Sequence, residues 1–416
     1  MSRYTEVTRK LRFVRKSHFE RFAAPWRSPR TRLVSAAAAF CFGGLLYSLV
    51  LGDGTRYPDE ADYLALARHA LEGLGYSLDG TTPYTERSPG YVWALAPLLI
   101  VYDSIHAVRL SQFAALVLCA VLLADIAARS GHGALRSTLH RADIAVLLLG
   151  GIAAYPVLIY TAGTLFPQTF IALGLVGVLW LLEVPEPKGR TALAAGLLAG
   201  WVAELSPNAL AILPIGALHL ALSERWSPRQ MLPYAAGASF VIGLWTLRNL
   251  LLTGEFIPFA DNLTTNLQVS FAHTAALEGI DWETAVDGFS SLSDRATQLL
   301  SAPTVYLANL GDHFAWHNEL SVAEEWTPLR GAVMYVTYHV LLMLVALRLA
   351  LVPIARLARI ERTLLSLYVA TACFHALVFA RLRWRLPFDL LLLLPALEAL
   401  LICRAHWYRR IRTALS

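Results

Sequence analysis

The sequence predicts an all-α membrane protein with about ten transmembrane helices. Of its 416 residues, 56% are hydrophobic and only 16% are charged, whereas charged residues make up about a quarter of an ordinary soluble domain. Several apolar runs approach the roughly 20 residues that a helix needs to cross a bilayer, and the run at 33–51 contains no charge. The alternating pattern of membrane β-barrels is absent from the sequence, so helices are the predicted spanning elements.

Basic residues predict the orientation of the chain. The segment 1–32 contains ten Lys and Arg residues but only two acidic residues, and a second basic tail follows at 404–416. Basic segments next to spanning helices mark the cytoplasmic side. We therefore expect a multi-pass protein of the inner (plasma) membrane with both tails in the cytoplasm. The net charge of +5 then reflects topology, and no nucleic-acid partner is expected.

The same rule applied to the apolar runs gives ten predicted spans. They lie at about 33–51, 105–127, 143–162, 166–183, 191–204, 207–222, 231–252, 331–352, 363–380 and 386–403. We divide the chain into the tail 1–32, a transmembrane module 33–253, an extracytoplasmic loop 254–330, C-terminal transmembrane helices 331–403 and the tail 404–416. The first outer loop, 52–104, is expected to contain interfacial helices, one of which (91–102) is too short to span.

A polar cluster follows the first predicted span. Asp59, Glu60 and Asp62 place three carboxylates within four residues where the chain leaves the bilayer. An enzyme acting on lipid-linked substrates would need an acid–base residue at this depth. Asp59 also precedes a helical pattern, so helix capping is the alternative role. The two roles are compatible, because a pinned carboxylate is already positioned for catalysis.

Arginines break the positive-inside rule at three places on the predicted outer face. Arg87 lies in the first loop, Arg248 ends the span 231–252, and Arg381, Arg383 and Arg385 follow the span 363–380. Guanidinium groups pair well with phosphate oxygens, so a bound anion would explain these positions. Snorkelling to lipid headgroups is the alternative explanation.

Histidines offer a weaker signal. His313 and His317 are four residues apart, near three glutamates, and this spacing could hold a metal on a helix face. Loop histidines are more often solvated or packed, so no metal site is predicted there. A divalent metal held by Asp59 and Glu60 stays open. The four cysteines lie in apolar runs and indicate no disulfide framework.

Five short segments form an ordered set: 59–63, 73–76, 87–91, 245–249 with Gly254, and 383–389. Their order and approximate spacing resemble the GT-C glycosyltransferases, polytopic enzymes that use polyprenyl-phosphate sugars and include the aminoarabinose and protein-mannosyl transferases. The resemblance covers most of the membrane region. At 163–164 and 206–208, where relatives often carry an acidic residue and Arg-Pro, this chain has Gly-Thr and Ser-Pro-Asn.

The resemblance implies that Asp59 is the catalytic carboxylate, with Glu60 as its competitor or as a residue that orients the acceptor. It also implies that Arg383 and Arg385, with Arg248 as a candidate, hold the donor phosphate. The other expected substrate-binding residues are Asp62, Tyr63, Arg87, Tyr91, Asn249 and Arg381. Asp59 and the late arginines must then converge on one outward-facing cavity.

The expected activity is therefore transfer of a sugar from a polyprenyl-phosphate donor to a glycan, lipid or protein acceptor on the non-cytoplasmic face, in contact with membrane lipid. The alternative is a transporter or flippase of lipid-linked saccharide. Transporters usually show inverted repeats and a polar site at the membrane midplane. The sequence shows no convincing repeat, and its polar residues gather at one surface, although prolines interrupt several of its apolar runs. A non-catalytic assembly scaffold is a third interpretation.

Overall fold

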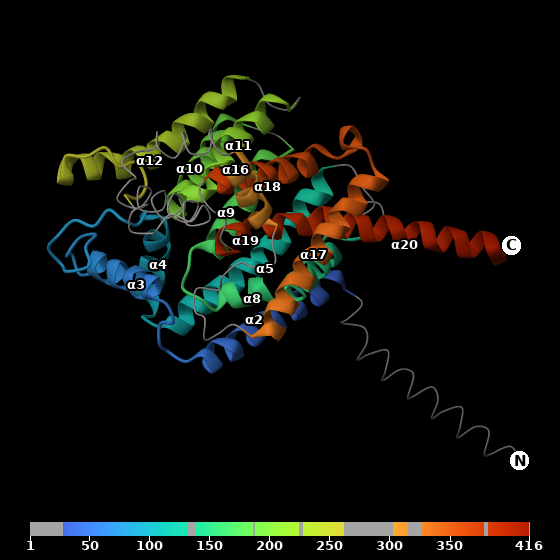
Figure 1. Ribbon diagram of the computed structural model, residues 1–416, viewed down its shortest axis with the longest axis horizontal. Coiled ribbons are helices and arrows are strands. Elements are labelled where there is room, and N and C mark those ends of the chain that lie inside the picture. The colour runs from blue at the N-terminus through green and yellow to red at the C-terminus, as the bar shows by residue number, and fades with distance from the viewer. Residues whose placement is uncertain are drawn as a thin grey trace, which may run out of the picture.

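The computed structural model describes residues 28–130, 139–185, 188–223, 228–261, 303–314, 327–377 and 382–415, and in these ranges every regular element is a helix (Figure 1). The α-helices are α2 (Pro29–Leu51), α3 (Pro58–Leu71), α4 (Gly90–Val101), α5 (Ile105–Arg129), α7 (Arg141–Ala153), α8 (Pro156–Ala162), α9 (Gln168–Leu182), α10 (Gly189–Leu205), α11 (Ile212–Ala221), α12 (Met231–Thr253), α16 (Pro303–His313), α17 (Pro328–Leu351), α18 (Arg359–Leu377), α19 (Leu382–Asp389) and α20 (Leu393–Leu415). Short 3₁₀ helices are η2 (Pro207–Ala209), η3 (Pro228–Gln230), η5 (Ile354–Arg356) and η6 (Leu390–Leu392). The predicted all-α class is confirmed for these ranges.

Five of the described helical segments are long and apolar enough to cross a membrane: α2, α5, α12, α17 and the stretch 383–407. The bent pair α7 and α8 would make a sixth. Such helices are those of a multi-pass membrane protein. Each of the ten predicted spans coincides with a described helix or helix pair, but α9, α10, α11 and α18 do not meet the same criteria of length and apolarity. Ten crossings therefore stay a prediction.

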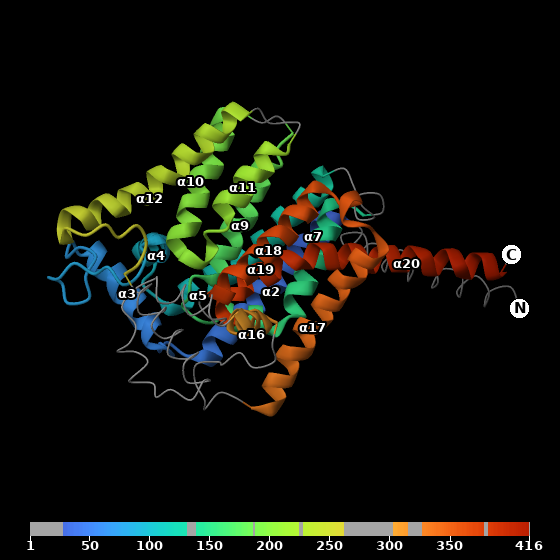
Figure 2. The same ribbon diagram turned by 45° about the horizontal axis from the view of Figure 1, so that its top comes forward.

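Helix α9 lies in the core of the molecule and buries residues on all its faces. Eleven of its fifteen residues are buried, as expected for a helix surrounded by other helices. Its neighbour α10 packs closely against α12. A side chain at Gly196 would collide with the backbone of Tyr234, so the small residue sets this approach, as is common between membrane helices. In Figure 2, α19 lies in the middle of the molecule.

The third predicted span is broken. Helices α7 and α8 meet at a bend of 85°, and Pro156 is the first residue of α8. Proline has no N–H to continue the preceding helix but fits the first turn of a new one. Tyr155 fixes the break, because its hydroxyl donates a hydrogen bond of 2.7 Å to Asp389 at the end of α19.

The segment between α2 and α5 contributes α3 and α4, which lie side by side at one edge of the molecule in both views (Figures 1 and 2). The short helix predicted at 91–102 is present as α4, which spans only 12 residues. The capping role suggested for Asp59 is wrong: Tyr57 is the N-cap of α3, and Asp59 lies in the first turn. A proline at the start of α3 shifts the helix beginning upstream of Asp59, because proline favours this position.

Candidate active site

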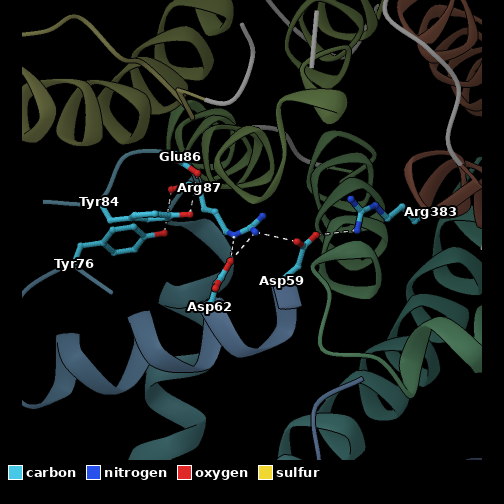
Figure 3. A network of polar contacts seen from close by, with 7 residues as sticks. All are labelled: Asp59, Asp62, Tyr76, Tyr84, Glu86, Arg87 and Arg383. Carbon is cyan, nitrogen blue, oxygen red and sulfur yellow. Dashed lines mark hydrogen bonds and ion pairs between the residues drawn. The ribbon is translucent and has the colours of Figure 1, made fainter. Parts of the chain in front are cut away.

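Asp59 lies between two arginines that come from distant parts of the chain (Figure 3). Arg87 donates a hydrogen bond of 2.9 Å to Asp59 Oδ1, and Arg383 donates one of 3.0 Å to Asp59 Oδ2. Arg87 also pairs with Asp62 at 2.7 Å. Asp59 and Asp62 are three residues apart on α3, so both carboxylates face the same side of the helix. This cluster joins the first loop to α19.

The loop that carries Arg87 is braced from two sides. The Tyr76 hydroxyl donates to the carbonyl oxygens of Arg87 and Ser88, at 3.0 and 3.2 Å. Arg248, on α12, donates to the carbonyl oxygens of Tyr76 and Tyr84, each at 3.1 Å. Arg248 therefore acts through the loop: its guanidinium holds the segment that presents Arg87.

A cavity of about 130 Å³ opens at this cluster. Its lining comes from the start of α3, the loop before α4, the start of α9, the end of α10 with η2, α18 and α19. The lining residues are Asp59, Tyr63, Arg87, Ser88, Phe166, Pro167, Gln168, Leu205, Ser206, Pro207, Asn208, Ala260, Phe374, Arg383 and Trp384. A small concave site with a few convergent polar groups is the usual form of a ligand site.

The electrostatics of the cavity keep the Asp59 carboxylate ionised. Burial raises the pKa of Asp59, but the charges of Arg87 and Arg383 and their hydrogen bonds outweigh it and hold the pKa below its ordinary value. The carboxylate is thus ionised at neutral pH. Asp59, Asp62, Arg87 and Arg383 together carry no net charge, so a phosphate would bind here by pairing directly with the guanidinium groups of Arg87 and Arg383.

Glu60 does not share this cavity. Its side chain is fully buried and accepts hydrogen bonds from the backbone N–H groups of Arg56, at 2.8 Å, and Leu165, at 3.0 Å. Glu60 therefore ties α3 to the turn before α9. Asp59 and Glu60 hold different partners and do not form a pair that could grip one metal ion.

Two tyrosines predicted to bind substrate lie one behind the other. Tyr63 lines the cavity, and its ring meets Tyr91 edge to face, with ring centroids 4.9 Å apart. Tyr91 is fully buried, so it supports Tyr63 from behind. Asn249 is also buried and donates to the carbonyl oxygen of Ile257 at 2.8 Å. Arg248, Asn249 and Tyr91 are not brought to the cavity.

The expected joint action of Arg383 and Arg385 is not what the structure shows. Residues two apart on a helix do not face each other, and only Arg383 reaches the cavity. Arg385 is buried, pairs with Asp389 at 3.1 Å and donates to the backbone oxygen of His313. Its guanidinium also stacks 3.5 Å from the ring centroid of Tyr338. Arg381 lies outside the described residues.

Of the two histidines singled out in the sequence, His313 and His317, the structure describes one. His317 lies outside the described ranges. His313 ends α16 and contacts His375, with their Nδ1 atoms 3.1 Å apart. Burial, with His375 and Arg385 nearby, lowers the pKa of His313 to about 2. Within the described part of the chain, no group of three or more His, Cys, Asp or Glu side chains could hold a metal ion.

Several lining residues were not predicted from the sequence. Gln168 and Phe166 belong to an unremarkable apolar segment, and no sequence signal singled them out. Asn208 belongs to the segment 206–208, where the chain departs from the GT-C pattern, so that departure was the available signal. Trp384 stands between two predicted arginines, and its position alone was a clue.

The comparisons with known proteins add one distant similarity. No protein-family model and no curated protein sequence matches the chain. Among solved structures, the chain is similar to ArnT from Cupriavidus metallidurans, whose structure was determined with undecaprenyl phosphate bound. The identity is 14%, the match covers 88% of this chain and 77% of that one, and the TM-score is 0.41. A score of this size does not establish a shared fold.

Proposed function

We propose that the chain is a membrane glycosyltransferase that moves a sugar from a polyprenyl-phosphate donor to an acceptor at the non-cytoplasmic face. The single observation that carries the proposal is the position of Asp59, an ionised carboxylate held between Arg87 and Arg383 at the wall of a cavity. A carboxylate can take a proton from an acceptor. The arginines can bind the phosphate and stabilise its growing charge. The ordered GT-C-like motifs of the sequence support the same activity.

The proposed reaction uses these groups as follows. An acceptor oxygen or nitrogen forms a bond to the anomeric carbon of the sugar and gives its proton to Asp59. The bond between the anomeric carbon and the phosphate oxygen breaks, and its electron pair leaves with the polyprenyl phosphate. Arg383 and Arg87 balance the negative charge that gathers on the leaving group. Fixed cations of this kind act most strongly in a site that excludes water.

Donor binding and base strength are coupled in this arrangement. The donor phosphate and Asp59 compete for the same guanidinium groups. As Arg383 and Arg87 turn toward the phosphate, Asp59 loses the partners that hold its pKa low, and its burial then makes it a stronger base. The acceptor is therefore activated only after the donor is in place.

The test is a transfer assay with the purified full chain in lipid nanodiscs. A polyprenyl phosphate carrying a radiolabelled sugar is the donor, and lipid, glycan and peptide fractions of the cell envelope are offered as acceptors. We expect transfer by the wild type and a loss of about 10²–10⁴-fold in Asp59→Asn, the usual contribution of a general base. Asp103→Asn is the matched control, because Asp103 forms an exposed ion pair with Arg68 away from the cavity lining.

The flippase alternative keeps one structural argument. The 85° break between α7 and α8 is of the kind that transporters use at their binding sites. The nanodisc assay together with a liposome assay separates the two functions. A flippase would leave the bond between sugar and phosphate intact in nanodiscs and would move the labelled donor between the leaflets of a liposome.

A further inference from the structure

Part of the cavity lining is polar but uncharged. It consists of four side chains with hydroxyl or amide groups, namely Ser88, Gln168, Ser206 and Asn208. Such groups both donate and accept hydrogen bonds, as sugar hydroxyls do. The lining thus combines charged with uncharged polar residues. The charged residues suit a phosphate, and the uncharged ones suit a ligand rich in hydroxyl groups.

Two polar atoms on these four side chains lack a hydrogen-bond partner among the residues described. They are the Ser88 hydroxyl oxygen and the Gln168 amide oxygen, on side chains whose residues are only 7% and 6% exposed. Buried polar groups are nearly always paired, so Ser88 and Gln168 keep unused hydrogen-bonding capacity next to the cavity. Asn208 donates to Ser206 at 3.1 Å, which leaves its amide oxygen for a further partner.

Aromatic rings complete the lining of the cavity. Phe166, Phe374 and Trp384 contribute to the lining, and Arg383 stacks on Phe166 with its guanidinium 5.0 Å from the ring centroid. A sugar ring has apolar C–H faces as well as hydroxyl edges. The aromatic rings can contact the C–H faces of a sugar, and the neighbouring amide groups can bond its hydroxyl groups. Ligand pockets commonly combine apolar surface with a few placed polar groups in this way.

We infer that Ser88, Gln168, Ser206 and Asn208 form the subsite for the transferred glycosyl group, and that this group is a neutral, hydroxyl-rich sugar. The inference rests on the proposed function. Asp59 is the sole carboxylate among the described lining residues, and two arginines already neutralise it. The lining therefore offers a cationic amino sugar no unpaired carboxylate. Glu204, which precedes the lining segment, has both carboxylate oxygens buried away from solvent.

The experiment measures binding to the purified full chain in nanodiscs by competition with a fluorescent polyprenyl phosphate. The competitors are bare polyprenyl phosphate and polyprenyl phosphates that carry a neutral hexose, a cationic amino sugar or an anionic uronic acid. We expect the neutral hexose donor to bind roughly tenfold more tightly than the bare lipid, as befits added hydrogen bonds to groups that otherwise stay unpaired. Asn208→Ala and Gln168→Ala should remove this advantage and leave the affinity for the bare lipid unchanged.

A second binding measurement tests for a gain of affinity. Asn208→Asp places a carboxylate of nearly the same shape in the subsite, so this variant should bind the cationic amino sugar donor better than the wild type does. Ser111→Ala is the matched control, because Ser111 bonds the carbonyl oxygen of Val108 within its own helix and does not line the cavity.

The outcomes distinguish the subsite from the proposed function. Equal binding of bare and glycosylated lipids by the wild type overturns the subsite, while the phosphate site stands. Tighter binding of the amino sugar donor by the wild type overturns the neutral class. If no polyprenyl phosphate binds at all, the proposed function fails and the inference fails with it.

Discussion

The Asp59 carboxylate accepts a hydrogen bond of 3.0 Å from Arg383, although 324 residues separate the two. Asp59 lies in the first turn of α3, and Arg383 lies on α19 near the end of the chain. Both side chains are about 30% exposed or less, so the pair is open to a ligand but partly desolvated. A charge pair in this environment is stronger than one on an open surface.

The two neighbouring carboxylates should separate function from stability. Asp59→Asn should lower transfer strongly with a small change in melting temperature, because partly exposed ion pairs contribute roughly 0–1 kcal/mol each. Glu60→Gln should lower the melting temperature strongly and affect transfer less. It weakens two hydrogen bonds to a buried charge, for a loss of about 1.5–3 kcal/mol. Thermal unfolding in detergent, measured beside the transfer assay, checks both. Equal loss of activity from equally stable variants would contradict the assignment of Asp59 over Glu60.

The pH dependence should differ between the free enzyme and its donor complex. Asp59 acts only when ionised, so activity is lost as the pH falls through its pKa. In the free protein this pKa lies below the ordinary value of 3.8, so the acid limb of kcat/KM for the donor should lie below pH 4. The acid limb of kcat reports the enzyme–donor complex. In that complex the donor phosphate also pairs with the arginines, so the limb should lie at higher pH. A kcat limb at lower pH than that of kcat/KM would rule out the competition for Arg383.

Arg383 and Arg385 should behave differently although both lie on α19. Arg383→Gln should raise the Kd for bare polyprenyl phosphate by roughly tenfold or more, because it removes a charge-assisted contact to the phosphate. Thermal stability should change little. Arg68→Gln, from an exposed ion pair, is the control. Unchanged lipid affinity in Arg383→Gln would remove Arg383 from the phosphate site.

Arg385→Met should destabilise the protein by about 3–5 kcal/mol, because it leaves Asp389 buried without its cation. The double variant Arg385→Met with Asp389→Leu should recover part of this loss, since apolar replacement of both partners removes the uncompensated charge. Unfolding measurements on the wild type, the single variants Arg385→Met and Asp389→Leu, and the double variant give the coupling energy. A stable Arg385→Met that has lost lipid binding would instead restore the phosphate role expected from the sequence.

Gly90 should tolerate no side chain. It is the first residue of α4, and an added Cβ would collide with the backbone at Glu204 and Leu205 of α10. Gly90→Ala should push apart two lining segments, the one that carries Ser88 and the one that carries Ser206, so both the melting temperature and transfer should fall. Gly150→Ala is the control, because a Cβ there meets nothing within 4 Å. If the two alanine variants behave alike, close packing at Gly90 does not shape the site.

Much of the helical framework could be predicted from the sequence, because apolar length is a local property. All ten predicted spans fall on described helices, and the short helix predicted at 91–102 is present as α4. The break inside 143–162 was not expected. Proline alone does not say whether a helix kinks gently or turns by 85°, since the bend depends on partners such as Asp389, which fixes Tyr155.

The sequence by itself determined the helical class, the apolar segments and the short list of charged residues at their ends. It did so because hydropathy and charge act residue by residue. Only the tertiary structure decided which of those charges meet. It joined Asp59 to Arg87 and Arg383, buried Glu60 and Arg385, and brought Gln168 and Asn208 to the lining of one cavity. Side chains two residues apart on one helix point in different directions, and packing with distant helices decides which of them faces the cavity.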